Sequence, residues 1–429
     1  MSDEKGIQRP DTARAVITGY GAITPIGNSA AEYWGGLITG RSGAGPITHF
    51  DASPNEVRIA AEVKGFDPLL TMDMKMARRM SRFVQFAVAA ATEAIEHAGL
   101  ANIHEWEPER RDRVATVINT GGGGIEQVTM GADAFREKGG RFVSAFAIPA
   151  LSPSMGACMV SMKYGLTGPA ITQAAACATG VLAFQDALRL IRSGESDVVI
   201  AGGVEASVDA LPMAGFAAMK ALSTRNDAPE KASRPYDADR DGFVLGEGGG
   251  VLILEEYEHA KARGAKIYCE IAGQGLTSDG YHIAAPDPEG RGVIRAMQLA
   301  LKDAGLSTKD IFHLNAHATS TPAGDVAEAN ALRGALGADA DHVAVSATKS
   351  MTGHLLGGAG AIESIFCVLA MKHHVAPPTI NIENLDDAVK VDVVRDVPRK
   401  LPDGPIACIN DSFGFGGHNV VLIFRSYES

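Results

Sequence analysis

Long apolar runs are missing from this sequence. Nowhere do about 18 apolar residues follow one another without a charge, so we expect no membrane-spanning helix and no membrane insertion. The opening residues, MSDEKGIQRPDTA, are polar and lack the apolar segment of a secretory signal. We therefore expect residues 1–13 to form a disordered N-terminal tail.

Cysteine and basic residues are both scarce. The 5 cysteines, none in CxxC spacing, are too few for a disulfide scaffold, which favours a reducing cytoplasm. We expect neither a metal nor a cofactor. Acidic residues outnumber basic ones by 51 to 39, which gives a net charge of −12. We therefore expect no binding to nucleic acid, and an acidic partner would need a local basic patch.

Strands and helices alternate along the chain and are separated by glycine turns. Val114–Gly124 is typical of a buried strand that ends in a glycine loop, and Arg82–His97 has apolar residues at helical spacing. The second part of the chain repeats this order, with Ile311–Ser320, Val343–Met371 and Ile406–Phe424 as counterparts of earlier segments. The pattern predicts an α/β fold with mostly parallel sheets. We place the two halves at residues 14–260 and 261–429.

The stretch ITQAAACATGVLAFQDALRL, residues 171–190, places Cys177 where an apolar run becomes a helix. Most free cysteines are small buried apolar residues, and this interpretation stays open on the residue alone. The alternative is a nucleophile, because a helix N-terminus lowers the pKa of a cysteine from about 8.5 to between roughly 3.5 and 7.5. The small neighbours of Cys177 leave room for a substrate carbonyl. We expect the other four cysteines to be structural.

Two histidines lie at corresponding turns of the second half. His317 in NAHATSTPAGD and His354 in SATKSMTGHLLGGAG have Gly, Ser and Thr as neighbours, which is less typical of a core histidine than of a functional one. Lys349 and Glu363 flank His354, and spacing alone favours an ordinary solvated pair. The loop FGFGGHN, residues 413–419, lets its backbone approach a ligand closely, so one of its N–H groups is a candidate oxyanion donor.

Cys, His, His and a C-terminal GFGG loop in this order resemble the β-ketoacyl-[acyl-carrier-protein] synthases of the type II elongating class, in the thiolase superfamily. The resemblance runs from about Arg14 to Arg425 and includes ALSTRNDAPEKASRPYDADRDGFVLGEG, ATKSMTGHLLGGAG and NDSFGFGGHN. It implies a five-layer αβαβα sandwich built from two tandem βαβαβαββ halves. It also implies an acyltransferase that elongates fatty acids by two carbons, through decarboxylative condensation of malonyl-acyl carrier protein with an acyl-cysteine and release of CO2.

The resemblance implies a role for each matching residue. Cys177 would carry the acyl chain, and the backbone N–H groups of Cys177 and Phe415 would form its oxyanion hole, with Phe415 also a gatekeeper. His317 and His354 would hold the malonyl carbonyl. The supporting residues would be Lys349, Glu363 and Asp325. The substrate-binding residues would be Thr319, Thr321, Gly122, Phe216 and Phe413. The carrier-docking residues would be Lys75, Arg78, Arg79 and Lys220, the first three within a basic run that also contains Arg82.

Three residues depart from the family pattern. Ala318 stands where glycine is common and tightens the loop beside His317, and His418 stands where threonine is common. Gly122 takes the place of a bulky residue at the acyl pocket. We therefore expect a more open pocket and a wider range of accepted chain lengths.

The implied partners are an acyl carrier protein, with phosphopantetheine-linked acyl and malonyl groups, and a second copy of the chain in a homodimer. Two alternatives stay open. A type II polyketide ketosynthase shares the Cys–His–His set, and a chain-length-factor-like partner would be non-catalytic but usually lacks the nucleophile. A thiolase needs a second cysteine in the glycine loop and an initiating type III synthase needs Cys–His–Asn, so neither of these fits.

Overall fold

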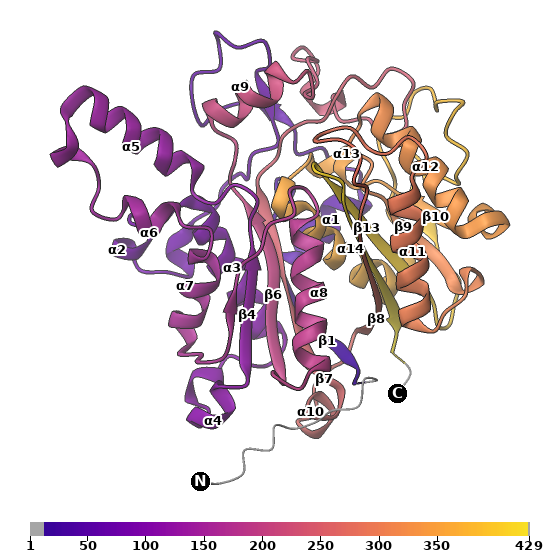
Figure 1. The fold of residues 1–429 in the computed structure, drawn as a ribbon, viewed down its shortest axis with the longest axis horizontal. Helices are drawn as coiled ribbons and strands as arrows, with labels where there is room; N and C mark the ends of the chain where they lie inside the picture. The colour runs from indigo at the N-terminus through magenta and orange to yellow at the C-terminus, as the bar shows by residue number, and fades with distance from the viewer. Residues whose placement is uncertain (1–12, 428–429) are drawn as a thin grey trace.

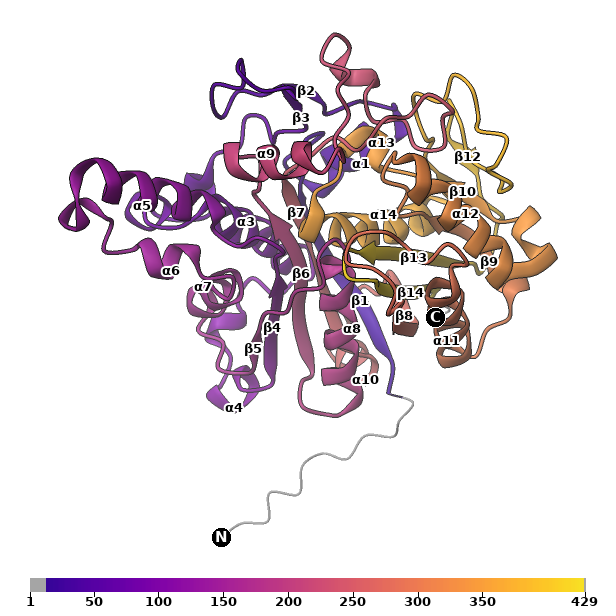
Figure 2. The ribbon, with the colours of Figure 1, turned by 45° about the horizontal axis from the view of Figure 1, so that its top comes forward.

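The computed structural model describes residues 13–427, which form a ten-stranded sheet divided and flanked by helices (Figures 1 and 2). The expected tail lies outside the described residues, apart from Ala13, which is buried. Across the sheet the strands are β10 (Ala344–Ser346), β9 (Ile311–Asn315), β13 (Ala407–Gly414), β14 (His418–Ser426), β8 (Cys269–Ser278), β1 (Ala15–Ile23), β7 (Gly248–Glu256), β6 (Val198–Glu205), β4 (Val114–Asn119) and β5 (Ala170–Ile171).

The two halves of the sheet have the same strand order. From the outer edge inward, each half runs third, second, fourth, fifth and first strand, as β5-β4-β6-β7-β1 and β10-β9-β13-β14-β8. The first strands of the halves, β1 and β8, pair antiparallel over Ala15–Ile17 and join the halves into one sheet. The tandem repeat expected from the sequence is therefore confirmed by the topology.

The expectation of mostly parallel sheets is wrong. The outer strands of each half pair in parallel, but the five central pairings, from β13 to β6 across the sheet, are antiparallel. A short turn between Gly414 and His418 joins β13 to β14, and strands joined by such a turn must run antiparallel. The carboxyl ends of the parallel strands still meet at one edge, where the functional turns gather.

The helices form three layers around the two half-sheets (Figure 2). Two central helices contact both half-sheets, and α14 is buried from Ala359 to Met371 because its residues are small or apolar on every side, with Glu363 as the exception. The expected five-layer αβαβα sandwich is therefore confirmed. The helices are α3 (Arg82–His97) and α7 (Met155–Tyr164) on the first half, α8 (Thr179–Arg192) and α14 (Ala359–His373) in the centre, and α11 (Arg291–Ala304) and α12 (Pro322–Leu336) on the second half.

A helical pair projects from the first half (Figure 1). It consists of α5 (Ile125–Lys138), in which no residue is buried, and the shorter α6 (Ala147–Leu151). Within residues 13–427, none of the helices combines the length and apolar character that a membrane crossing requires. The remaining α-helices are α1 (Ala30–Ile38), α2 (Met74–Ala77), α4 (Pro108–Arg111), α9 (Ala210–Ala218), α10 (Tyr257–Ala262) and α13 (Lys349–Thr352).

Candidate active site

Cys177 lies on a sharp turn directly before α8. The preceding residue, Ala176, has a φ of +48°, a left-handed conformation that few residues with a side chain adopt. Ser412 donates to the Cys177 carbonyl at 3.1 Å. Gly414 packs against this turn so closely that a Cβ there would lie 2.4 Å from the carbonyl oxygen of Ala175. The glycine loop of the second half is thus pressed onto the cysteine turn of the first.

Burial dominates the chemistry of the thiol. It raises the pKa of Cys177 to about 12, and Glu205 acts in the same direction. Lys349 and the backbone N–H groups of Phe415 and Cys177 lower this pKa in part. The expectation of a lowered pKa is therefore wrong, because desolvation outweighs the helix N-terminus. The two N–H groups at the sulfur are those that the resemblance assigned to the oxyanion hole.

His317 and His354 come together beside Cys177, although 36 residues separate them in the chain. Their ring centroids are 5.4 Å apart and their planes are almost perpendicular. Among the described residues, neither ring nitrogen of His354 has a hydrogen-bond partner, although the residue is buried. Burial lowers the pKa of both imidazoles well below 6.5, and Lys349 lowers both further. At neutral pH the cavity therefore contains two uncharged imidazoles.

Lys349 sets the proton position on His317. Its ammonium group lies 3.4 Å from His317 Nδ1 and 2.5 Å from Glu363 Oε1. An ammonium group donates only, so Nδ1 accepts and the ring proton is on Nε2. The interpretation of Lys349 and Glu363 as a solvated pair is wrong, because each side chain is 1% exposed. They form the buried pair that the resemblance implied.

We predict that Lys349→Met destabilises the protein by about 3–5 kcal/mol, because it leaves the Glu363 carboxylate buried without its partner. Lys349→Met/Glu363→Leu should recover most of this loss. Thermal and denaturant unfolding of the two variants measure the difference. Equal destabilisation of both variants would contradict the prediction.

Two cavities meet at Cys177. One, of about 300 Å³, is lined by His317, His354 and both threonines of the resemblance, Thr319 and Thr321. The other, of about 410 Å³, extends past Gly122. Phe216 and Phe415 line both cavities, and Phe413 lines the first. The structure therefore brings these expected substrate-binding residues to cavities that share the thiol.

Gly122 faces a polar wall of the second cavity. A Cβ at Gly122 would lie 2.9 Å from Ser207 Oγ and 3.1 Å from Glu205 Oε1. Glu205 is buried and accepts from the backbone N–H groups of Gly121, Gly122 and Gly357 at 3.0–3.1 Å. Glycine is therefore required here as long as Ser207 and Glu205 keep their positions.

Asp325, the expected supporting acid, lines neither cavity. It is buried behind the His317 loop and accepts from the backbone N–H groups of Ser320 and Thr321 at 3.1 and 3.3 Å. Arg240 lies 3.5 Å from Asp325 and 2.8 Å from Asp386. Asp325 thus supports the loop through its backbone.

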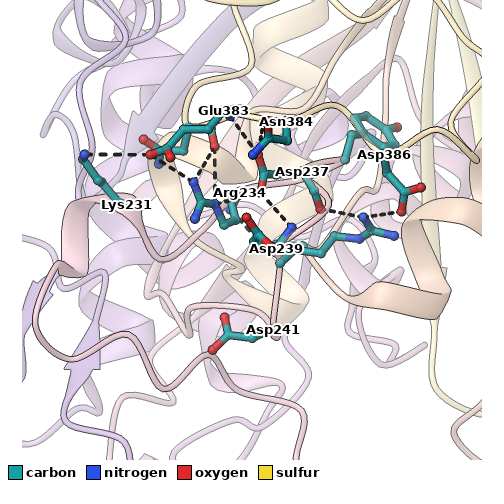
Figure 3. Close-up of polar contacts among 12 residues, drawn as sticks. Lys231, Arg234, Asp237, Asp239, Asp241, Glu383, Asn384 and Asp386 are labelled. Atoms are coloured by element: carbon teal, nitrogen blue, oxygen red, sulfur yellow. Dashed lines mark hydrogen bonds and ion pairs between the residues drawn. The ribbon is translucent and has the colours of Figure 1, made fainter.

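The segment that carries Arg240 is itself tied to residues 383–386 (Figure 3). Arg234 lies 3.3 Å from both Asp237 and Glu383. Asp237 also accepts from the backbone N–H groups of Glu383 and Asn384 at 2.7 and 2.8 Å. This polar network connects the segment of Arg240, which contacts Asp325 behind the His317 loop, to residues 383–386 of the second half of the chain.

The expected docking residues lie on the surface and differ in whether their charged groups contact a neighbouring side chain. Lys75 and Arg78 are exposed, and the guanidinium group of Arg79 stacks over Phe146 at 4.2 Å. Lys220 is exposed but lies 3.1 Å from Glu56. Arg82 differs from the others, because its guanidinium group binds the buried Glu247 through two hydrogen bonds of 2.8 Å.

Sequence reasoning missed three buried acids around the site: Glu205, Glu328 and Asp411. Glu205 ends β6, and Glu328 follows Asp325 by one turn of α12. The strand-end position of Glu205 and the i, i+3 spacing of Glu328 from Asp325 are the signals that could have identified these two residues. Asp411 stands within the quoted NDSFGFGGHN run, where its strand position gave no sign that it lies behind His317.

A buried thiol with backbone N–H groups at its sulfur and two neutral imidazoles beside it suits the transfer of an acyl group and the stabilisation of an enolate. In a five-layer αβαβα sandwich, this chemistry defines the protein as an acyl-transferring enzyme of the thiolase fold.

Comparison with known proteins identifies the family. The model of the "Beta-ketoacyl synthase, N-terminal domain" matches residues 12–260, and that of the "Beta-ketoacyl synthase, C-terminal domain" matches residues 268–383. The chain belongs to the beta-ketoacyl synthase family. It is 49% identical to the 3-oxoacyl-[acyl-carrier-protein] synthase 2 of Synechocystis sp., over 97% of this chain and 98% of that protein.

Solved structures agree with this assignment. A beta-ketoacyl synthase from Burkholderia phymatum superposes with a TM-score of 0.89 at 36% identity, over 97% of this chain and 100% of that one. A type II polyketide ketosynthase, solved with its acyl carrier protein, superposes with a TM-score of 0.86 at 30% identity, over 97% and 100% of the two chains.

Proposed function

We propose that the protein is a 3-oxoacyl-[acyl-carrier-protein] synthase that elongates fatty acids by two carbons. The observation that carries this proposal is that two neutral imidazoles, His317 and His354, lie with Cys177 at one cavity. The relatives with 45–49% identity over nearly their full length bear this name. That likeness supports the fatty-acid function over the polyketide alternative.

In the first step Cys177 takes the acyl group from the carrier protein. A bond forms between the Cys177 sulfur and the acyl carbon, the bond to the pantetheine sulfur breaks, and the thiol proton leaves with that sulfur. The negative charge on the acyl oxygen is stabilised by the backbone N–H groups of Cys177 and Phe415. The N-terminus of α8 stabilises the thiolate character that develops on the sulfur during the attack.

In the second step malonyl-acyl carrier protein loses CO2. The electron pair of the broken carbon–carbon bond forms an enolate, and His317 and His354 donate hydrogen bonds to its oxygen. The proton that Lys349 places on Nε2 of His317 suits this donation. The enolate carbon then attacks the acyl-cysteine and displaces the thiolate of Cys177, which takes up a proton from solvent. The product is a 3-oxoacyl group two carbons longer.

The proposed partners follow from two surfaces. Lys75, Arg78, Arg79 and Lys220 give the acidic enzyme a local basic surface for an acidic carrier protein in the cytoplasm. We also propose a homodimer, because the apolar side chains of Met130 and Phe135 on α5 are exposed in the single chain. The same helix borders the second cavity at Ile125. Sedimentation equilibrium should give twice the chain mass, and a monomer would contradict it.

A condensation assay tests the proposed function. Acyl carrier proteins loaded with chains of increasing length are incubated with malonyl-acyl carrier protein, and products are identified by mass. We expect 3-oxoacyl products two carbons longer than each accepted primer. Products extended several times without reduction would instead indicate a polyketide ketosynthase, and absence of products would contradict the proposal.

The Gly122 wall gives a prediction for the same assay. Gly122→Ala places a methyl group against Ser207, so we expect the free energy of unfolding to fall by about 1–3 kcal/mol. We also expect the variant to reject the longest acyl chains that the wild type accepts. Gly122→Ala/Ser207→Ala removes the closest contact, at Ser207 Oγ, but also the hydrogen bond of 2.9 Å from Ser207 to the buried Glu205, so we expect only part of the stability to return. Unfolding curves measure the first effect and product masses the second. A Gly122→Ala variant as stable as the wild type would contradict the crowding.

A further inference from the structure

Two buried carboxyl groups meet at the backbone N–H of His317. Glu328 Oε1 lies 2.7 Å and Asp411 Oδ1 lies 2.9 Å from this nitrogen. Glu328 Oε2 also accepts from the backbone N–H of Ala318 at 2.7 Å. Glu328 belongs to α12 and Asp411 to β13, so two distant elements converge on the backbone of one imidazole-bearing residue. The mechanism above uses neither carboxyl group.

Two ionised carboxylates are unstable in this arrangement. Both residues are at most 5% exposed, and like charges at such short range repel strongly away from water. Within residues 13–427, no lysine or arginine forms an ion pair with either group. The charged and titratable groups that act on the pair are Asp325 from α12, Lys349 from α13, Glu363 from α14, and Tyr236. Arg240 lies next to them, 3.5 Å from Asp325.

The nearby cationic side chains form ion pairs with other acids. Lys349 binds Glu363 at 2.5 Å, and Arg240 binds Asp386 at 2.8 Å and lies 3.5 Å from Asp325. A carboxylate accepts hydrogen bonds and donates none, so the two groups can bond to each other only if one of them carries a proton. Such a proton removes the repulsion without moving any backbone.

We propose that Glu328 and Asp411 share one proton and that this carboxyl pair is a positioning element, which holds the backbone of His317 so that its ring meets the malonyl carbonyl. The assignment rests on the proposed function, in which His317 stabilises the enolate. Glu328 lines the first cavity and Asp411 lines neither cavity. In this proposal both act through the backbone N–H of His317, so they are positioning residues.

The arrangement has a pH dependence of definite sign. Burial raises the pKa of both Glu328 and Asp411, and the neighbouring Asp411 raises that of Glu328 further. Acids with raised pKa values keep a proton at neutral pH and lose it as the pH rises. Loss of the shared proton leaves two adjacent anions behind His317. We therefore expect malonyl decarboxylation to fall on the alkaline side, while acylation of Cys177, which does not use His317, falls less.

The test compares pH profiles of kcat for decarboxylation in the wild type, Asp411→Ala and Asp411→Asn. Asp411→Ala should lose at least tenfold at neutral pH, because one support of the His317 N–H is gone. Asp411→Asn keeps an oxygen for this N–H and can never become a second anion. It should recover most of the rate, and its alkaline decline should lie at least one pH unit higher or disappear. Asp186→Asn, in a buried acid of α8 outside both cavities, is the matched control and should keep the wild-type profile.

An Asp411→Asn profile with the wild-type alkaline decline would overturn the shared proton. Equal loss of acylation and decarboxylation in Asp411→Ala would overturn the positioning of His317. The Asn variant keeps the test decisive even where the Ala variant fails to fold. Failure of the proposed function would show differently, as a wild type that forms no 3-oxoacyl product at any pH.

Discussion

Cys177→Ala should abolish condensation, with a fall in rate of at least about 10⁴-fold, because the acyl-enzyme intermediate has no atom on which to form. The variant should still decarboxylate malonyl-acyl carrier protein, since His317 and His354 remain. The yield of 3-oxoacyl product measures the first effect, and peptide mass mapping after incubation with acyl-loaded carrier protein shows whether an acyl adduct has formed. Release of CO2 measures the second.

The matched control for Cys177→Ala is Cys158→Ala, which removes a half-buried thiol of α7 outside both cavities. It should keep the wild-type rate and still form the acyl adduct on Cys177. An acyl adduct on any other cysteine, or condensation by Cys177→Ala, would refute Cys177 as the nucleophile.

The second large effect is expected for His317→Ala/His354→Ala. Removal of one oxyanion donor costs about 10²–10³ in rate, so loss of both should slow decarboxylation by at least about 10³-fold even if the two effects are not additive. Acylation of Cys177 should persist, because its oxyanion donors are backbone N–H groups. Decarboxylation by the double variant at the wild-type rate would show that the enolate is stabilised elsewhere.

His104→Ala is the control for the histidine variants. The His104 side chain is 54% exposed and lies outside both cavities, so its loss should change neither step. The two steps are measured separately, by the acyl adduct on Cys177 and by release of CO2. A double histidine variant that lost both equally would indicate a collapsed site rather than a lost donor.

Much of the fold could be predicted because hydrophobic periodicity is a local property. Arg82–His97 was expected as a helix and is one, and the repeated order of elements appears as the same strand order in both half-sheets. The direction of strand pairing was not predictable in the same way. It depends on which strands become neighbours, and the antiparallel centre arises from contacts between segments far apart in the chain. The domain division at residue 260 stays a prediction.

The functional residues also divide into those that the local sequence predicts and those that only the packing reveals. Cys177, His317 and His354 stand out as polar or reactive residues at glycine-rich turns, and such turns meet at one edge of an α/β sheet. Spacing alone does not reveal that Lys349 and Glu363 are buried, because their burial depends on the packing of α14 between both half-sheets. The chain length that the enzyme prefers stays a prediction, since the Gly122 wall depends on Ser207 and Glu205 from another strand end.

The sequence by itself determined the order of elements, the nucleophile candidate and the two histidines, because each of these depends on residue type and local spacing. Tertiary structure alone decided the protonation of the site. The raised pKa values of Cys177, Glu328 and Asp411 and the neutral imidazoles all result from the removal of water by segments that are remote in the chain. Desolvation is a property of the packed molecule, and no short stretch of sequence encodes it.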